Sequence, residues 1–423
     1  WKVFIALIVW QNILVFQNRI LWIKWKNLKS KGVNCLNNMK KIYADHAATT
    51  KLSANALRAM MPYLRENFKN PSTLYSSARI PRKAIEDARD MIAKAIGAFS
   101  DEIIFTSGGT ESDNWAIKNM LFYKDGYKNK IITSSIEHHA ILNSCKAMEK
   151  LGFEVIYLPV DKEGIITPNV LEKEMGSDVA LVSIIYANNE IGTIQNIKEL
   201  ATITHKYGAL FHTDAVQAVG HIEIQVHELD VDMLSASAHK FNGPKGVGFL
   251  YLKEGVKIEP FITGGSQESG KRAGTENVAS VVGMAEALKE NILSLKDNTR
   301  YLLSLEKAFL DLLKKVNIDF IVNGSINKNP GNISLSIANV DGELLLHRLD
   351  LKGIEVATGS ACDSVNNQIS HVIRAIGVPE KYARGTIRIS LGVENTIEDI
   401  DIIVRELSDI VSSLKRENNF MDE

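Results

Sequence analysis

The chain has 423 residues, of which 45% are hydrophobic and 23% are charged. This length and composition predict a globular protein with one large core and a second, smaller lobe. The formal net charge of −1 at pH 7 gives no general attraction to nucleic acid or to an anionic membrane, so we expect neither as a partner.

The first 38 residues differ from the rest of the chain. Their longest unbroken apolar run, residues 3–10, is too short for a spanning helix, which needs about 20 apolar residues. The tryptophan and lysine side chains of residues 22–29 would suit an interfacial anchor. We expect instead that Met39 is the natural start and that residues 1–38 lie outside the fold.

Three cysteines, Cys35, Cys145 and Cys362, are widely separated in the sequence. No two of them have the spacing of a metal site, and small secreted domains held by disulfides are much richer in cysteine. We therefore expect a reducing compartment, the cytoplasm, and no bound metal. Cys145 lies in an amphipathic helical pattern, which favours a buried and unreactive thiol.

From Glu102 onward, short apolar strands alternate with amphipathic helical patterns. The expected strands are residues 103–106, 130–133, 154–158, 179–185 and 209–212, and residues 197–207 form one of the helices between them. This alternation is typical of a largely parallel sheet that is covered by helices on both faces. Ligands of such sheets bind at the carboxyl ends of the strands.

The pattern changes after about Leu295 to that of a smaller α+β lobe. Its expected elements are a long helix that ends near residue 315, a strand at 332–337, a helix at 342–351, a strand at 385–390 and a helix at 397–414. We therefore expect a large domain over residues 52–295 and a small domain formed by residues 39–51 and 296–423.

Two strand ends carry the side chains that a pyridoxal phosphate enzyme needs. Residues 212–217 (His-Thr-Asp-Ala-Val-Gln) contain Asp214, and residues 235–240 (Ser-Ala-Ser-Ala-His-Lys) end in Lys240. A lysine holds the cofactor aldehyde as a Schiff base, and a carboxylate keeps the pyridine nitrogen protonated. Singly, such an Asp is more often a turn former and such a Lys is more often solvated. The glycines of residues 243–248 allow a close approach to a ligand, and the combination favours a cofactor site.

Two further motifs are weaker when taken alone. Residues 107–110 (Ser-Gly-Gly-Thr) follow a strand and open a helix, where backbone N–H groups and the helix dipole can hold a phosphate. A Gly-Gly pair at a strand end is nevertheless more often a tight connection. His138 comes directly after a strand, where a core or capping histidine is the common case.

Together, these motifs resemble those of the cysteine desulfurases, in the branch of the class V aminotransferase family that supplies sulfur for iron-sulfur clusters or nitrogenase. The resemblance runs from Lys41 to about Leu414. It implies pyridoxal 5'-phosphate as cofactor and the α/β fold of type I, the aspartate aminotransferase-like fold, with a large domain built on a mostly parallel sheet and a small α+β domain. The motifs that carry it are residues 107–114, 136–138, 187–192, 212–217, 235–240 and 359–362.

The resemblance also implies a role for each residue of the site. Lys240 would hold the cofactor, and His138 would stack on its pyridine ring and move protons. Asn189 and Arg388 would bind the carboxylate of L-cysteine. The residue at Thr275 reaches the partner subunit's cofactor phosphate in the family, which implies a homodimer, although alone it would be a simple helix N-cap. The other cofactor contacts would be Gly109, Thr110, Asn189, Asp214, Gln217, Ser237 and His239.

Cys362 lies among small and polar residues, 357–367, which predict an exposed, mobile loop rather than a packed core. Such a loop could collect sulfur inside the site and deliver it outside. We expect the Cys362 thiolate to take the sulfur of L-cysteine as a persulfide, with release of L-alanine, and to pass it to an acceptor such as an iron-sulfur scaffold protein. Asp363 stands where the family often has a hydroxyl residue; its charge would lower the thiolate fraction and alter the transfer rate or the choice of partner.

Other functions of the same fold compete with this prediction. A transaminase would have no use for Cys362, and a non-catalytic assembly platform would need neither Cys362 nor Lys240. Selenocysteine is chemically close to cysteine, so the sequence leaves selenocysteine lyase activity open. It also leaves open whether the role is general or dedicated to nitrogenase.

Overall fold

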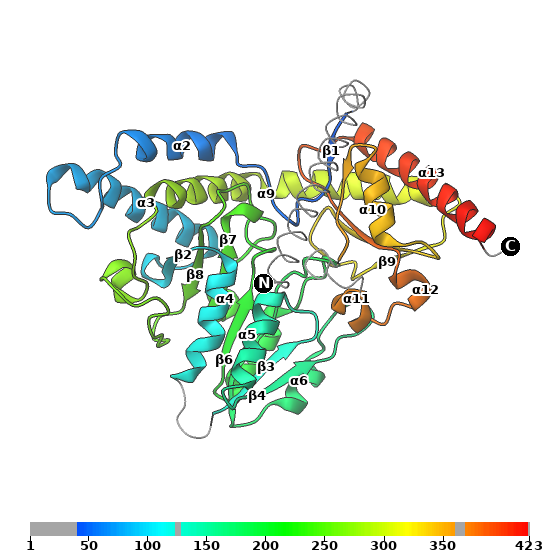
Figure 1. Ribbon diagram of the computed structural model, residues 1–423. Helices are drawn as coiled ribbons and strands as arrows, with labels where there is room; N and C mark the ends of the chain where they lie inside the picture. Colours follow the sequence, from blue (N-terminus) through cyan, green and yellow to red (C-terminus); the bar gives the residue numbers. More distant parts are fainter. Residues whose placement is uncertain (1–39, 123–127, 360–368, 422–423) are drawn as a thin grey trace, which may run out of the picture.

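The computed structural model describes residues 40–122, 128–359 and 369–421, with the backbone alone for 417–421. Cys362 and Asp363, the tail 1–38 and Cys35 therefore lie outside the described residues. The largest element is a sheet of seven strands in the order β2-β8-β7-β6-β5-β3-β4 (Figure 1). Its strands are β2 (Ile103–Thr106), β3 (Lys130–Ser134), β4 (Glu154–Leu158), β5 (Val179–Ser183), β6 (Leu210–Asp214), β7 (Met233–Ser237) and β8 (Gly248–Leu252).

Six of these strands run in one direction, and only β8 is antiparallel to its neighbours β2 and β7. The sheet is thus mostly parallel, as predicted, but strand β8 was not foreseen. Its reversal follows from the short connection between β7 and β8, because a parallel pair needs a crossover of a dozen residues or more.

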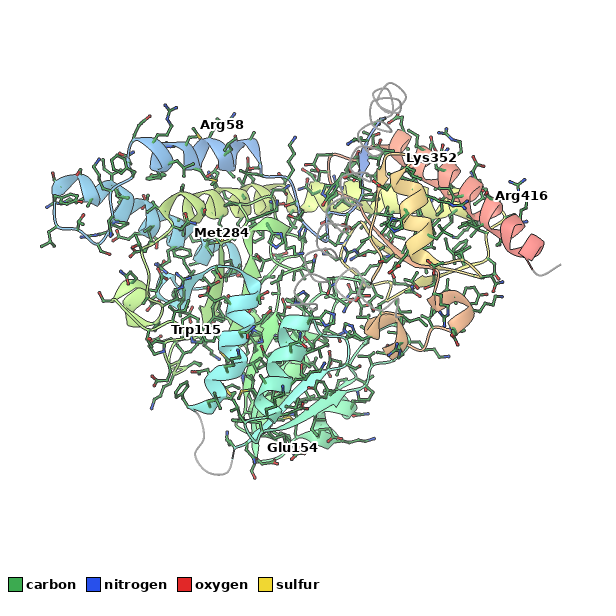
Figure 2. The ribbon with its side chains drawn as sticks, in the orientation of Figure 1. Arg58, Trp115, Glu154, Met284, Lys352 and Arg416 are labelled. Atoms are coloured by element: carbon green, nitrogen blue, oxygen red, sulfur yellow. The ribbon has the colours of Figure 1, made fainter. Side chains whose placement is uncertain are left out.

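Helices cover both faces of this sheet because its strands are buried on both sides. Neighbouring residues of one strand pack on opposite faces: Leu181 joins the core beneath α4 (Gly109–Lys118) and α5 (His139–Glu149), while Val182 joins the core on the other side. That second core includes α3 (Arg79–Ile96), α7 (Ile197–Lys206) and the start of α9 (Val278–Leu313). Figure 2 labels one residue of each core, Trp115 on α4 and Met284 on α9.

A smaller antiparallel sheet has the order β12-β10-β9, with β9 (Phe320–Asn323), β10 (Asn332–Ile337) and β12 (Thr386–Ser390). It shares a core with the second half of α9, with α10 (Gly342–Asp350) and with α13 (Ile397–Met421). A short parallel pair, β1 (Ile42–Tyr43) with β11 (Ile354–Glu355), ties the start of the described chain to this part.

The remaining elements are short connections and one amphipathic helix. The remaining α-helices are α2 (Ala54–Arg65), α6 (Pro168–Glu174), α8 (Val226–Leu229), α11 (His371–Ala375) and α12 (Glu380–Ala383). The 3-10 turns are η1 (Ser76–Ala78), η2 (Ser100–Glu102), η3 (Asn119–Leu121), η4 (Ala238–Lys240) and η5 (Gln267–Gly270). No helix among these described residues is long and apolar enough to cross a membrane.

Helix α9 runs from the side of α2 to the side of α13 (Figure 1) and crosses the predicted domain boundary at residue 295. It begins at Val278, earlier than expected, with Asn277 rather than Thr275 as its N-cap: the Asn277 side chain accepts a hydrogen bond from the Ser280 N–H. The first turns of α9 pack in the core of the large sheet and the last turns pack in the core of the small one. The division into two domains stays a prediction.

Candidate active site

A cavity of about 320 Å³ lies at the carboxyl ends of the parallel strands, where the large sheet meets β12 and the segment after β1. It gathers ten of the twelve predicted site residues from distant parts of the chain. Thr275 is not among the lining residues, and Cys362 lies outside the described residues. The ten are Gly109, Thr110, His138, Asn189, Asp214, Gln217, Ser237, His239, Lys240 and Arg388.

Asp214 is a buried carboxyl group at the floor of this cavity. It ends β6, whose last four residues are all buried, so the position of the strand fixes the position of the carboxyl group. Burial raises the pKa of Asp214, and the neighbouring His138, the Val216 N–H and Lys240 oppose this shift. One oxygen, Oδ1, accepts a hydrogen bond from the Val216 N–H at 2.9 Å, so Asp214 also closes the turn after its strand.

A second acid, Asp113 on α4, lies close to Asp214. Ligand atoms of Asp113, His138 and Asp214 all lie within 4.8 Å of one another. Burial and the neighbouring charge of Asp214 raise the pKa of Asp113 well above its usual range. Its Oδ1 atom has no hydrogen-bond partner among the residues that the structure describes. Burial therefore disfavours the charged form of both acids, and that of Asp113 more strongly.

His138 is the N-cap of α5, which is the capping role that is common for a histidine after a strand. It also lines the cavity. Its Nδ1 atom accepts a hydrogen bond from the Ala140 N–H at 3.1 Å, so the neutral ring carries its proton on Nε2. Burial lowers the pKa of His138, and Lys240 adds to this shift while Asp214 opposes it. The ring is thus prepared to act as a neutral acid or base.

Lys240 follows β7 on the turn η4, and its amine points at the backbone of the segment after β1. The Nζ atom donates to the carbonyl oxygen of Ala47 at 2.7 Å and to that of Ala48 at 2.8 Å. Gln217 Nε2 donates to the same Ala47 oxygen at 2.7 Å. The segment after β1 therefore forms part of the site and holds the lysine amine.

The first turn of α4 forms another part of the cavity wall. Gly109 is required there because a Cβ atom would lie 2.4 Å from Val216 Cγ2. The N–H groups of a first helical turn have no partner within the helix, and the helix dipole adds positive potential. Ser237 lies beside this turn, His239 lines the same cavity, and burial lowers the pKa of His239 to about 4. This end is suited to an anion.

Arg388 projects from β12 into the cavity and is held from two sides. One terminal nitrogen donates to Asp45 Oδ1 at 2.7 Å, and the other donates to the Asn189 carbonyl oxygen at 2.9 Å. The Nε atom is buried and has no partner among the described residues. The guanidinium group is therefore fixed in orientation at the cavity, where the second N–H of each terminal nitrogen could meet a ligand carboxylate.

The sequence profile of the class-V aminotransferases matches residues 42–403. The chain is 52% identical over 377 residues to the cysteine desulfurase IscS of Dictyoglomus turgidum, an alignment that covers 89% of this chain and 96% of the relative. The chain therefore belongs to the cysteine desulfurases of this family. It is also 45% identical over 385 residues to the cysteine desulfurase IscS of Methanosarcina thermophila, with 91% and 95% of the two chains covered. The predicted family and activity are confirmed.

Solved structures agree with this assignment. A NifS-like protein superposes with a TM-score of 0.83 at 37% identity and covers 88% of this chain and 100% of its own. The solved structure of SspA in complex with cysteine superposes with a TM-score of 0.76 at 34% identity and covers 84% and 100% of the two chains. The predicted fold, that of the pyridoxal phosphate-dependent enzymes of type I, is confirmed.

Among the further residues that line the cavity, five are titratable and were not singled out from the sequence: Asp113, Glu137, His139, Glu190 and His371. The first four lie inside or beside motifs that carried the family resemblance, so their neighbours were the available signal. What the sequence could not show is their burial. Glu137 is fully buried, and its Oε1 accepts hydrogen bonds from Ser134 Oγ at 2.6 Å and from the Ile185 N–H at 2.9 Å.

Glu137 generates a testable pH dependence, because burial raises its pKa from 4.5 to about 8. Between these two pH values, the folded chain keeps a proton that the unfolded chain has lost. The contribution of Glu137 to the free energy of unfolding therefore falls as pH rises, by about 1.4 kcal/mol per pH unit. We expect Glu137→Gln to become progressively more stable relative to the wild type from pH 5 to pH 8 in thermal unfolding.

The control for this experiment is Glu86→Gln, because Glu86 is exposed on α3. Its stability relative to the wild type should not change with pH. A difference between Glu137→Gln and the wild type that stays constant over the same pH range would show that Glu137 is ionised in the folded protein.

Proposed function

We propose that this chain binds pyridoxal 5'-phosphate in the cavity and converts L-cysteine to L-alanine, with transfer of the sulfur to Cys362 as a persulfide. The observation that carries the proposal is the convergence of an amine, a buried carboxyl, a neutral imidazole and an oriented guanidinium group on one cavity. The similar SspA structure is a complex with cysteine, which supports the choice of substrate.

The residues present fit the cofactor. Asp214 is a buried carboxyl group that accepts its hydrogen bond from a backbone N–H rather than from a positively charged donor, so a protonated pyridine nitrogen would complete it. Lys240 would bind the aldehyde, and Gln217 would lie at the ring hydroxyl. When bound, the cofactor would supply an electron sink for the bonds to the substrate Cα. The phosphate would be held by Gly109, Thr110, Ser237 and His239 at the first turn of α4.

Arg388 and Asn189 would bind the substrate carboxylate. The Asn189 carbonyl and Asp45 already fix the guanidinium plane, so little side-chain entropy is lost when the substrate arrives. Each terminal nitrogen uses one N–H in these bonds and would donate the second to the substrate. Substrate binding therefore depends on the small sheet, which carries Arg388, as well as on the large one.

Two groups would move protons. The Lys240 amine would take the proton from the substrate Cα, and His138 would hold or release a proton at Nε2. Sulfur transfer would form an S–S bond to Cys362 and break the substrate Cβ–S bond, whose electron pair stays on carbon and takes up a proton to give the methyl group of alanine. The persulfide would then pass to an acceptor such as an iron-sulfur scaffold protein. The cytoplasmic location of the protein stays a prediction.

The direct test follows alanine and sulfide during anaerobic turnover of L-cysteine with a reductant. We expect the wild type to release both in equal amounts and Cys362→Ala to bind substrate but release neither. Cys145→Ala is the matched control: Cys145 is buried on α5, as predicted, and burial raises its pKa to about 12, so it stays a thiol. Loss of activity in the Cys145 variant with full activity in the Cys362 variant would contradict the proposal.

We also propose that the chain forms a homodimer through the turn between α2 and α3. Apolar side chains gather on this turn, which projects from the edge of the molecule (Figure 1). Phe68 is 64% exposed and Leu74 is 96% exposed. Large apolar side chains clustered on a surface mark an interface. The segment that carries Thr275 lies near this turn, because Pro71 and Ser72 line one cavity together with Lys271 and Glu276.

Sedimentation of the holoenzyme tests the dimer. The wild type should sediment as a dimer, and the double variant Phe68→Glu/Leu74→Glu should sediment as a monomer. The control is Ile326→Glu, because Ile326 is 99% exposed in the connection between β9 and β10. A double variant that remains dimeric would place the interface elsewhere.

A further inference from the structure

The carboxylate of Glu190 lies between the two ends of the segment that carries Cys362. Gly359 is the last described residue before residues 360–368, and Ser370 is the second one after them. The Ser370 hydroxyl donates a hydrogen bond to Glu190 Oε2 at 2.6 Å. A Cβ atom on Gly359 would lie 2.2 Å from the same oxygen. One buried oxygen atom therefore contacts both ends.

Each end is shaped for this contact. The backbone of Gly359 is not in the left-handed region, so glycine is required there for space rather than for conformation. The Ser370 hydroxyl also accepts a hydrogen bond from the Val372 N–H at 3.1 Å and thereby caps α11. It is thus satisfied as a donor and as an acceptor, and removing either partner would leave a buried polar atom unpaired.

Glu190 is itself rigidly held. Its side chain is buried, with 5% of the residue exposed, and its N–H donates to Asn188 Oδ1 at 2.9 Å. Asn188 Nδ2 in turn donates to the Ile136 carbonyl oxygen at 2.8 Å. Glu190 is therefore fixed to the residues that follow β3 and β5. These are also the segments that carry His138 and Asn189.

The residue after Ser370 makes a second attachment to the same segments. His371 Nε2 donates to the Glu137 carbonyl oxygen at 3.0 Å, and Glu137 precedes His138 in the chain. The end of the cysteine segment is thus attached beside His138 and beside Asn189. His371 and Glu190, which make these two attachments, both line the cavity.

We propose that Glu190 is a positioning residue for sulfur transfer, which holds both ends of the cysteine segment at the cavity wall; this inference rests on the proposed function. A tethered group reacts at an effective concentration that depends on where its tether is fixed. Because Gly359 and Ser370 both meet one carboxylate, Glu190 fixes the two points at which the segment that bears Cys362 joins the rest of the fold. Glu190 has this positioning effect through its contacts with Gly359 and Ser370, and it takes no part in the chemistry itself.

The sharpest test compares Ser370→Asn with Ser370→Asp in the holoenzyme. Both side chains have the same size and both can cap α11, but only Asn can donate a hydrogen bond to Glu190. We expect persulfide formation on Cys362 in a single turnover to be slower in Ser370→Asp than in Ser370→Asn, by about 100-fold. The L-cysteine concentration that gives half of the cofactor absorbance change should agree within about twofold between them.

Variants of Glu190 and Gly359 provide an independent test of the same inference. Glu190→Ala and Gly359→Ala should each slow persulfide formation, and the double variant should be no slower than Glu190→Ala, because the added Cβ then meets no carboxylate. The matched control is Glu306→Gln: Glu306 is buried to a similar extent, 7% exposed, but pairs with Lys328 at 2.8 Å away from the cavity. It should form the persulfide at the wild-type rate.

Equal rates in Ser370→Asn and Ser370→Asp would overturn the inference. So would a Glu190→Ala enzyme that loses affinity for L-cysteine but keeps its rate at saturation. Hydrogen exchange of the backbone over residues 358–372 gives a readout without turnover, and it should be faster in Ser370→Asp than in Ser370→Asn. If the wild type makes no alanine, the proposed function fails, while equal exchange in the two variants separately refutes the role of Glu190.

Discussion

The site depends on the carboxyl group of Asp214, which the fold buries even when no ligand is bound to neutralise its charge. Asp214 ends a strand whose core residues hold it in place, and the sheet cannot move it without loss of its own packing. A lone charge there would be costly, and burial accordingly raises the pKa of Asp214. The polar core beneath stays uncharged, because burial lowers the pKa of His212 to about 3. Ionisable groups that line the cavity, such as Asp214 and Lys240, lie at the strand ends, where a ligand can neutralise them.

The site also depends on contacts between the large sheet and the small sheet. The amine of Lys240 comes from the large sheet but is held by the carbonyl oxygens of Ala47 and Ala48, which follow β1. Arg388 comes from the small sheet but is oriented by the Asn189 carbonyl oxygen of the large one. Each part of the molecule therefore completes groups that the other part supplies, and the cavity exists only where they meet.

Much of this arrangement could be predicted from the sequence. Strands with unbroken apolar runs and polar ends indicate a buried parallel sheet, which brings Asp214 and Lys240 to one edge. The rest depends on long-range packing. The antiparallel β8 has no pattern that separates it from a parallel strand, and α9 gives no sign that it serves two cores. Glu190 is one motif residue among several in the sequence, and only the fold places it between Gly359 and Ser370.

The most direct test of the account is cofactor affinity, because Asp214 and Asp113 are neighbours that should behave differently. Burial and the neighbouring Asp214 charge favour the neutral form of Asp113, so Asp113→Asn should bind pyridoxal 5'-phosphate within about threefold of the wild type. Asp214→Asn removes the partner of the pyridine nitrogen and should bind about 10- to 100-fold more weakly, which is the value of a charged hydrogen bond. Equal affinities of Asp214→Asn and the wild type, or a larger loss in Asp113→Asn, would contradict the account.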